Sequence, residues 1–192
     1  SKVQYIVAHG ISTTIEGKTA VIGSYHFVFE DENCKIPAGE EAKFEALPEE
    51  YSHLYLALEG TLAAVICIED PLRAEAPGVI RKLREAGFKQ IVMMTGDSDR
   101  TARAIASKVG VDEYYSEVLP EDKANFITKE TEKGRKVMMI GDGINDSPAL
   151  SAASVGIAVS DGAEIAKEIA DITISAESLY EVVALKKISN AL

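Results

Sequence analysis

The segment KVMMIGDGINDSPALSAASVGIAVS, residues 136–160, decides the fold. An apolar run ends at Gly141-Asp142-Gly143, and a second acid, Asp146, follows just before an apolar helical pattern. A carboxylate at the end of a buried strand is costly unless a ligand compensates for its lost hydration. Both acids are oxygen donors of the kind that Mg²⁺ binds, usually as one or two carboxylates completed by substrate phosphate. The segment therefore predicts a strand–loop–helix corner that holds Mg²⁺ beside a phosphorylated substrate.

The pattern of the chain changes near residue 60. Before it, short β-like pieces are joined by turns, and Glu16-Gly17-Lys18 suits a hairpin. After it, apolar strands alternate with helices, which predicts a parallel sheet covered on both faces. The predicted fold class is therefore α/β, a Rossmann-like parallel sheet preceded by an antiparallel β-rich part. Strands are expected at 4–8, 12–15, 19–22, 25–29, 54–58, 62–68, 90–95, 136–140, 155–159 and 172–174, and helices at 77–86, 100–109, 121–133, 146–153, 163–170 and 179–188.

Short polar groups and glycines follow the strands of the predicted parallel sheet. In such sheets the ligand lies off the carboxyl ends of the strands. Glycine at Gly96 lets the backbone approach a ligand closely, and the Thr95 hydroxyl can donate to an anion. Lys123 lies one turn into the helix that begins at Pro120, and it can supply a point charge. With Mg²⁺, these groups predict a phosphoryl-transfer site that positions the phosphoryl group and neutralises its charge.

Composition limits the possible partners and compartments. Thirty-one acidic against twenty basic residues give a net charge of −11, which argues against a nucleic-acid partner. The longest apolar run, residues 62–68, is far shorter than the roughly 20 residues of a membrane helix. The start of the chain lacks a cleavable signal peptide, and Cys34 and Cys67 suit a reducing compartment. The sequence thus predicts a soluble cytoplasmic chain without a direct membrane span.

Several segments resemble the phosphorylation domain of P-type ATPases, within the haloacid dehalogenase superfamily. They are MMTGDSDRTARAIA, LPEDKA and MIGDGINDSPALSAASVGIAVSDGAEIAKEIADITI. The variants look most like the heavy-metal-transporting branch, and among its members most like carriers of zinc, cadmium or lead, with copper next. IEDPLRAEA resembles the segment that follows the nucleotide-binding domain, and GISTTIEGKTAVIGS is similar to part of that domain. The resemblance implies a partial nucleotide-binding domain at 1–60 and a haloacid dehalogenase-type phosphorylation domain, without its first strand, at 61–192.

The resemblance also implies a role for each matching residue. The residues around Mg²⁺ and the phosphate would be Asp142, Asn145 and Asp146. The residues that hold the phosphoryl group, stabilise its charge or close the interface between domains would be Thr95, Gly96, Asp97, Lys123, Asp70 and Arg73. The residues that shape the adenine pocket for ATP would be Gly10 and Gly17. The implied activity is ATP-driven export of a heavy-metal cation.

The family's nucleophile, the aspartate of a DKTGT segment, does not occur in these 192 residues. Three interpretations follow. The chain is a fragment of a transporter and inactive alone, or a free-standing phosphatase with Asp70 as nucleophile, or a non-catalytic remnant that binds Mg²⁺, nucleotide or a partner chain. The first is favoured, because Leu72 stands where superfamily phosphatases want a second acid, and Pro71 removes an N–H from the phosphate loop. Its partners would be ATP and the rest of the transporter.

A parallel sheet without its first strand leaves a strand edge uncovered. Unpaired backbone groups on such an edge bind other strands readily. We therefore expect that the chain self-associates, or fills the gap with its own N-terminal strand, or is only marginally stable.

Overall fold

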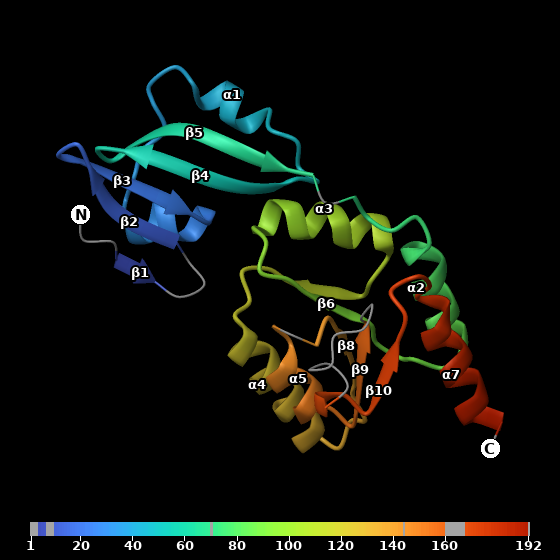
Figure 1. Cartoon of the computed structure of the whole chain (residues 1–192). Coiled ribbons are helices and arrows are strands. Elements are labelled where there is room, and N and C mark those ends of the chain that lie inside the picture. Colours follow the sequence, from blue (N-terminus) through green and yellow to red (C-terminus); the bar gives the residue numbers. More distant parts are fainter. Residues whose placement is uncertain (1–3, 7–9, 70, 144, 160–167, 192) are drawn as a thin grey trace. The chain divides into compact units, whose positions relative to one another are not determined.

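A five-stranded antiparallel sheet occupies the first part of the chain in the computed structural model (Figure 1). The structure describes residues 4–6, 10–69, 71–143, 145–159 and 168–191. The strands follow each other in chain order: β1 Gln4–Ile6, β2 Gly10–Ile15, β3 Lys18–Gly23, β4 Ser52–Leu58 and β5 Thr61–Ile68. The helices are η1 His26–Asp31, α1 Glu41–Glu45, α2 Ala76–Glu85, α3 Asp99–Val109, α4 Pro120–Glu132, α5 Ser147–Ala152 and α7 Tyr180–Ala191.

The predicted hairpin at Glu16-Gly17-Lys18 is confirmed. Strands β2 and β3 pair antiparallel from Gly10↔Gly23 to Ile15↔Lys18. The two residues at the turn, Glu16 and Gly17, have φ of 52° and 81°. Two-residue turns with positive φ at both positions match the twist of the flanking strands, and glycine adopts this conformation without steric cost. Gly17 is thus accounted for by the turn.

The strand predicted at 25–29 is wrong, because these residues begin the π-helical turn η1. The alternation of Tyr25, Phe27 and Phe29 imitates a strand, yet neighbouring Phe27 and Val28 are both fully buried. A strand would place these two neighbours on opposite faces, whereas a helical turn places both against the sheet. Burial of two large side chains therefore overrides the period-two pattern.

One hydrophobic core lies between the antiparallel sheet and the segments that cover it. Its buried residues come from β3, β4 and η1 and the segment after η1: Val21, Phe27, Val28, Cys34, Tyr55 and Ala57. Phe29 and Phe44 pack against it, with ring centroids 5.6 Å apart in an edge-to-face arrangement. Such aromatic pairs add to the free energy gained by burial.

The parallel part of the fold consists of two separate groups of strands. Strands β8 Met138–Gly141, β9 Val155–Val159 and β10 Ile172–Ile174 form a sheet in the order β10-β9-β8, with parallel pairing. Strands β6 Val92–Met94 and β7 Glu113–Tyr115 pair with each other. The predicted α/β class with a parallel sheet is confirmed. The helix predicted at 163–170 falls mostly outside the described residues.

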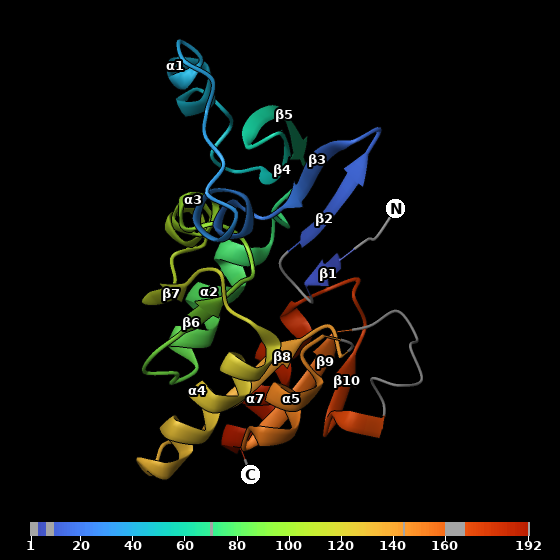
Figure 2. The same ribbon diagram turned by 90° about the vertical axis from the view of Figure 1, so that its left-hand side faces the viewer.

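Helices cover both faces of the three-stranded sheet (Figure 1 and Figure 2). Val79 and Leu83 of α2 and Val182 and Val183 of α7 pack with Ile157 of β9 on one face. Leu150 of α5 packs on the other face, and α4 packs against α5. A strand buried on both faces explains the continuous apolar sequence of β9. Among the helices in the described part of the chain, none combines the length and apolar character of a membrane span.

Strand β5 belongs to the antiparallel sheet, where it pairs with β4 from Ser52↔Ile68 to Leu58↔Thr61. The sequence pattern predicts this strand as one of the parallel strands, and that prediction is wrong. A continuous apolar run is typical of a buried parallel strand, but such a run alone does not fix its partner.

Contacts divide the chain into two compact units, and each is described by itself. The first contains residues 1–72, 95–108 and 114–117, and the second contains the remainder.

Among the described parallel strands, only β9 has a neighbour on both sides, so β6, β7, β8 and β10 each have one free edge. Among the described strands, β8 pairs with β9 alone and β6 pairs with β7 alone. The N-terminal strand β1 pairs antiparallel with β2, so the expectation that it fills a gap in the parallel sheet is wrong. Self-association and marginal stability stay predictions.

Gly10 provides a test of the packing beneath the antiparallel sheet. A Cβ atom at this position would lie 2.1 Å from Cδ1 of Phe27, which is fully buried. We expect Gly10→Ala to lower the free energy of unfolding by about 1–3 kcal/mol, as overpacked cores do. Urea unfolding followed by circular dichroism measures it. The double variant Gly10→Ala/Phe27→Leu should recover part of the loss, and an unchanged midpoint in the single variant would contradict the packing explanation.

Candidate functional site

The corner after β8 folds the Asp146 carboxylate over the end of the strand. A Cβ atom at Gly141 would lie 2.5 Å from Oδ2 of Asp146, so only glycine leaves room for the acid. The Asp142 N–H donates to the same Oδ2 at 3.4 Å. Asp146 is the residue before α5, and its carbonyl accepts the Leu150 N–H at 2.9 Å. The sequence GDGIND thus positions its second acid beside its first.

Lys123 forms an ion pair with Asp146. Its Nζ atom lies 2.8 Å from Oδ1, and the two side chains are only 15% and 13% exposed. Lys123 lies in the first turn of α4, and its N–H donates to the Leu119 carbonyl at 3.2 Å. Pro120 starts the helix at a position where its missing N–H is not needed. The predicted point charge is therefore aimed at the predicted metal-binding corner.

Asp142 organises the loop between the two acids. Its Oδ1 accepts the Asn145 N–H at 3.1 Å, and its Oδ2 accepts the Asn145 side-chain amide at 3.2 Å. Gly143 has a φ of 81° and lets the loop turn, while Ser147 Oγ donates to its carbonyl at 2.9 Å. Asp142 itself is exposed. The structure therefore brings together the three residues predicted to surround a metal ion.

The donor set of this corner fits Mg²⁺ in part. The described residues contain no group of three or more His, Cys, Asp and Glu side chains that could hold a metal ion unaided. Mg²⁺ requires less, because it is commonly bound by one or two carboxylates plus substrate oxygens and water. Asp142 and Asp146 supply that number, and the exposed Asp142 is reachable. The corner therefore fits a metal ion that arrives with a phosphorylated substrate.

The second predicted corner, Thr95-Gly96-Asp97, is held by its own acid. The Thr95 hydroxyl donates to Oδ2 of Asp97 at 2.8 Å and accepts the Asp97 N–H at 3.1 Å. The other carboxylate oxygen of Asp97 accepts the Ser52 hydroxyl at 2.6 Å. This corner belongs to the unit of the antiparallel sheet, and Lys123, Asp142 and Asp146 belong to the other. Their convergence on one phosphoryl group stays a prediction.

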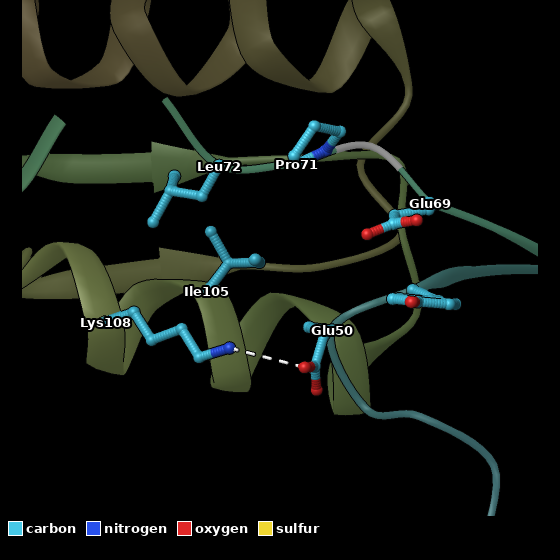
Figure 3. Close-up of a pocket in the computed structure, with 7 residues that line it drawn as sticks. Glu50, Glu69, Pro71, Leu72, Ile105 and Lys108 are labelled. Atoms are coloured by element: carbon cyan, nitrogen blue, oxygen red, sulfur yellow. Dashed lines mark ion pairs between the residues drawn. The ribbon is translucent and has the colours of Figure 1, made fainter. Parts of the chain in front are cut away.

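Of the two residues predicted to close the interface between domains, the structure describes Arg73 but not Asp70. Arg73 donates from Nη1 to the Ala176 carbonyl, which ties the segment before α2 to the segment before α7. Asp70 lies outside the described residues. Its neighbours Glu69 and Pro71 line a cavity of about 210 Å³ together with Leu72 (Figure 3). Gly10 and Gly17 are accounted for by packing and by turn geometry, and their contact with a nucleotide stays a prediction.

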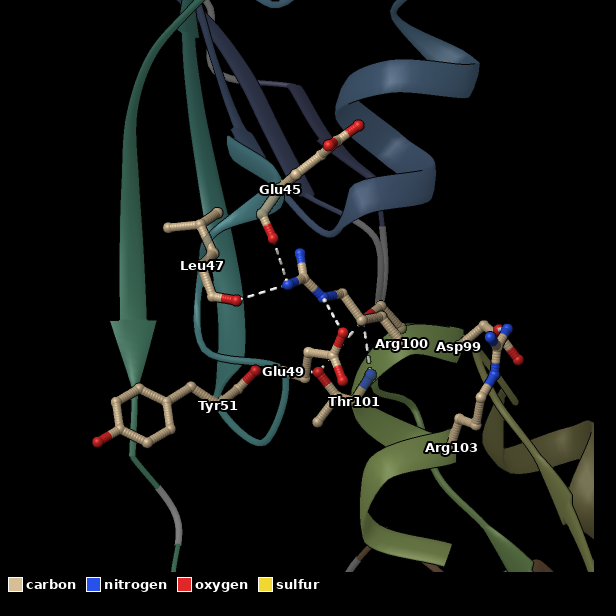
Figure 4. Close-up of polar contacts among 9 residues, drawn as sticks. Glu45, Leu47, Glu49, Tyr51, Asp99, Arg100, Thr101 and Arg103 are labelled. Atoms are coloured by element: carbon tan, nitrogen blue, oxygen red, sulfur yellow. Dashed lines mark hydrogen bonds and ion pairs between the residues drawn. The ribbon is translucent and has the colours of Figure 1, made fainter. Parts of the chain in front are cut away.

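Sequence reasoning missed Arg100, which lies in the first turn of α3 (Figure 4). Its Nη2 atom donates to the carbonyls of Glu45 and Leu47, each at 2.6 Å, and its Nε lies 3.5 Å from a carboxylate oxygen of Glu49. A cation near a helix N-terminus opposes the helix dipole. Arginine at this unfavourable position is therefore a sequence signal for hydrogen-bond acceptors in another segment of the chain.

The same guanidinium affects a nearby imidazole. Burial lowers the pKa of His53, and the positive charge of Arg100 lowers it further. The imidazole is therefore neutral near pH 7. Burial also raises the pKa of Tyr55 to about 12, so its hydroxyl stays protonated. The charge of Arg100 thus lies near aromatic side chains that are themselves neutral.

Comparison with known proteins gives one family match. A family model described as haloacid dehalogenase-like hydrolase matches residues 3–154. Copper-transporting ATPase 2 of Rhizobium meliloti is 49% identical over 140 residues, which is 73% of this chain and 17% of that protein. The zinc-exporting P-type ATPase of Mycobacterium marinum is 36% identical over 185 residues, 95% of this chain and 25% of that protein. The chain thus spans about a fifth of the length of these relatives.

Two solved structures share the fold. A zinc-transporting PIB-type ATPase has a TM-score of 0.64 at 29% identity, covering 100% of this chain and 30% of that one. The catalytic domain of the CPx-ATPase CopB-B has a TM-score of 0.66 and covers 96% of this chain and 64% of that one. At 23% identity the second likeness shows the fold alone.

The ion pair between Lys123 and Asp146 can be measured by a double-mutant cycle. Because both side chains are largely shielded from water, removing one leaves the other uncompensated. We expect a coupling free energy of about 1–2 kcal/mol between Lys123→Met and Asp146→Asn, measured by urea unfolding. The exposed pair Lys43–Glu40, three residues apart at the start of α1, serves as the control and should couple more weakly. Equal coupling in the two cycles would contradict the special role of the corner.

Proposed function

Because the chain belongs to the haloacid dehalogenase-like hydrolases, we propose that it is the cytosolic phosphoryl-transfer part of an ATP-driven heavy-metal transporter of the P-type. The observation that carries the proposal is the corner after β8, where Lys123 lies 2.8 Å from Asp146 and Asp142 lies beside it. A lysine, two carboxylates and adjoining backbone N–H groups form a setting for a metal-bound phosphoryl group. The identity to metal-transporting ATPases supports the wider role.

The proposed reaction moves the terminal phosphoryl group of ATP onto a carboxylate. The phosphorus–oxygen bond to ADP breaks as a bond to a carboxylate oxygen forms, and water later hydrolyses the acyl phosphate. That carboxylate lies outside the 192 residues, because no DKTGT segment occurs in them. Lys123 and the Thr95 hydroxyl stabilise the charge of the phosphoryl group, exchanging their acceptors Asp146 and Asp97 for phosphate oxygens.

Mg²⁺ is the cofactor proposed for this reaction. Asp142 and Asp146 would hold it, with Asn145 fixing the orientation of Asp142 through its two hydrogen bonds. When bound, the ion neutralises negative charge on the phosphate oxygens. The transported cation is proposed only as a class, a transition-metal ion, since the similar proteins are named for copper, silver, zinc and manganese.

A partner strand is part of the proposal. Among the described strands, β6 and β8 each have one paired side, so each can accept hydrogen bonds from a further strand. We propose that the segment bearing the nucleophile joins this parallel sheet, either from the same polypeptide or from a partner chain. The alternative of a free-standing phosphatase with Asp70 as nucleophile is less favoured, because Leu72 stands where a second acid is needed.

Acid-quenched labelling with γ-labelled ATP and Mg²⁺ tests the proposal. The chain alone should take up no label, and the chain combined with the segment that carries the nucleophile should form a label that hydroxylamine removes. A hydroxylamine-labile label on the chain alone that disappears in Asp70→Asn would instead establish the phosphatase alternative.

Metal dependence gives a second test that needs no turnover. We expect Asp142→Asn to weaken Mg²⁺-dependent binding of a phosphate analogue, orthovanadate, about tenfold or more, because one of two carboxylates is lost. Asp122→Asn, the same change on the exposed surface of α4, is the control and should bind as the parent does. Isothermal titration calorimetry with and without Mg²⁺ measures both, and equal binding in the two variants would contradict the metal role of Asp142.

A further inference from the structure

Two hydroxyl contacts join the Thr95–Asp97 loop and α3 to the first residue of β4 and the residue before it. Ser52 Oγ donates to the Asp97 carboxylate at 2.6 Å, and Thr101 Oγ1 donates to the Tyr51 carbonyl at 2.9 Å. Thr101 is only 3% exposed, so its hydroxyl is a buried polar group that needs this acceptor. The loop and the first turn of α3 are therefore attached to residues about 50 positions earlier in the chain.

Arg100 adds the charged part of this attachment. Its guanidinium bridges the carbonyls of Glu45 and Leu47 and approaches Glu49, as Figure 4 shows. Three acceptors within reach of one planar fork suit arginine, since lysine donates from a single point. The three acceptors also offset the unfavourable placement of a cation in the first turn of α3. The contact is thus specific to arginine rather than to positive charge.

The division of the chain into units supports the same attachment. Residues 95–108 belong with the antiparallel sheet, whereas Met94 and the rest of β6 belong with the other unit. The boundary therefore falls directly before Thr95. The Thr95–Asp97 loop thus follows β6 of the second unit directly in the chain, but it is hydrogen-bonded to Ser52 of the first unit.

We propose that Arg100 is a positioning residue, which fastens the Thr95–Asp97 loop to the segment 45–51 and so makes the loop follow the antiparallel sheet. The proposal rests on the proposed function in one respect, that Thr95 and Gly96 hold the phosphoryl group. Arg100 does not touch that group and acts through the loop. A displacement of the antiparallel sheet then carries the phosphoryl-binding loop with it.

Arg103 provides a matched control on the same helix. It lies three residues after Arg100, and its partners are Asp99 and the Tyr114 hydroxyl, both outside the segment 45–51. Arg100→Gln and Arg103→Gln make the same chemical change, but only the first removes a contact with that segment. Arg100→Lys keeps the charge and loses the fork, and it also serves if Arg100→Gln fails to fold.

Amide hydrogen exchange on the 192-residue chain tests the attachment without any turnover. We expect exchange at residues 95–101 to speed up on the order of tenfold in Arg100→Gln, less in Arg100→Lys, and not in Arg103→Gln. Exchange in β8 and β9 should stay at the parent rate. Equal rates at 95–101 in both glutamine variants would overturn the proposal. A uniform acceleration that includes β8 and β9 would also overturn it, because it would mean a general loss of stability.

The labelling reaction tests the consequence for chemistry. With the nucleophile segment present, Arg100→Gln should slow formation of the hydroxylamine-labile label about tenfold or more at an unchanged KM for ATP, since misplacement of a positioned group affects the chemical step. Arg103→Gln should leave both quantities as in the parent. A proportional rise in KM with an unchanged maximal rate would overturn the positioning role. If no variant forms a label, the proposed function fails and the exchange result alone decides the attachment.

Discussion

The ion pair between Lys123 and Asp146 joins the end of β8 to two helices. Lys123 comes from α4, Asp146 precedes α5, and the carboxylate lies over Gly141, the last residue of the strand. With both side chains mostly shielded from water, either charge alone would be strongly destabilising. The pair therefore fixes the packing of α4 against α5, which in turn covers one face of the parallel sheet. The position of Asp142 depends on the same carboxylate, because its N–H donates to it.

Much of the fold follows from local sequence patterns. The continuous apolar run at 155–159 predicts a buried strand, and Pro120 predicts a helix start. The structure contains both, as β9 and the start of α4. Two predictions failed because packing decides them: residues 25–29 form η1, since Phe27 and Val28 must both be buried, and β5 pairs with β4. The missing information is long-range in both cases. An apolar pattern in the sequence shows which side chains are buried. It does not show which other segment of the chain they pack against or pair with.

Some residues of the candidate site could likewise be predicted from the sequence, and others could not. Asp142, Asp146 and Lys123 could be predicted, because polar residues at the carboxyl ends of parallel strands meet at one edge and GDGIND carries both acids. The contacts of Ser52 and Arg100 could not, since their partners lie 45 to 55 residues away, and two of the partners of Arg100 are backbone carbonyls, which any sequence provides. Gly10 was assigned to a nucleotide by resemblance, and its close approach to Phe27 gives it a second, structural reason to be glycine.

The fit between Gly141 and Asp146 imposes an order on evolutionary change. A side chain at 141 would collide with the acid at 146, whereas a smaller residue at 146 would leave glycine at 141 unharmed. Drift away from this pair must therefore begin at the acid and lose the ion pair with Lys123 first. In the reverse order, a side chain at 141 would displace the acid at 146 from its position. Among descendants of this chain, we therefore expect an acid at 146 to occur together with glycine at 141.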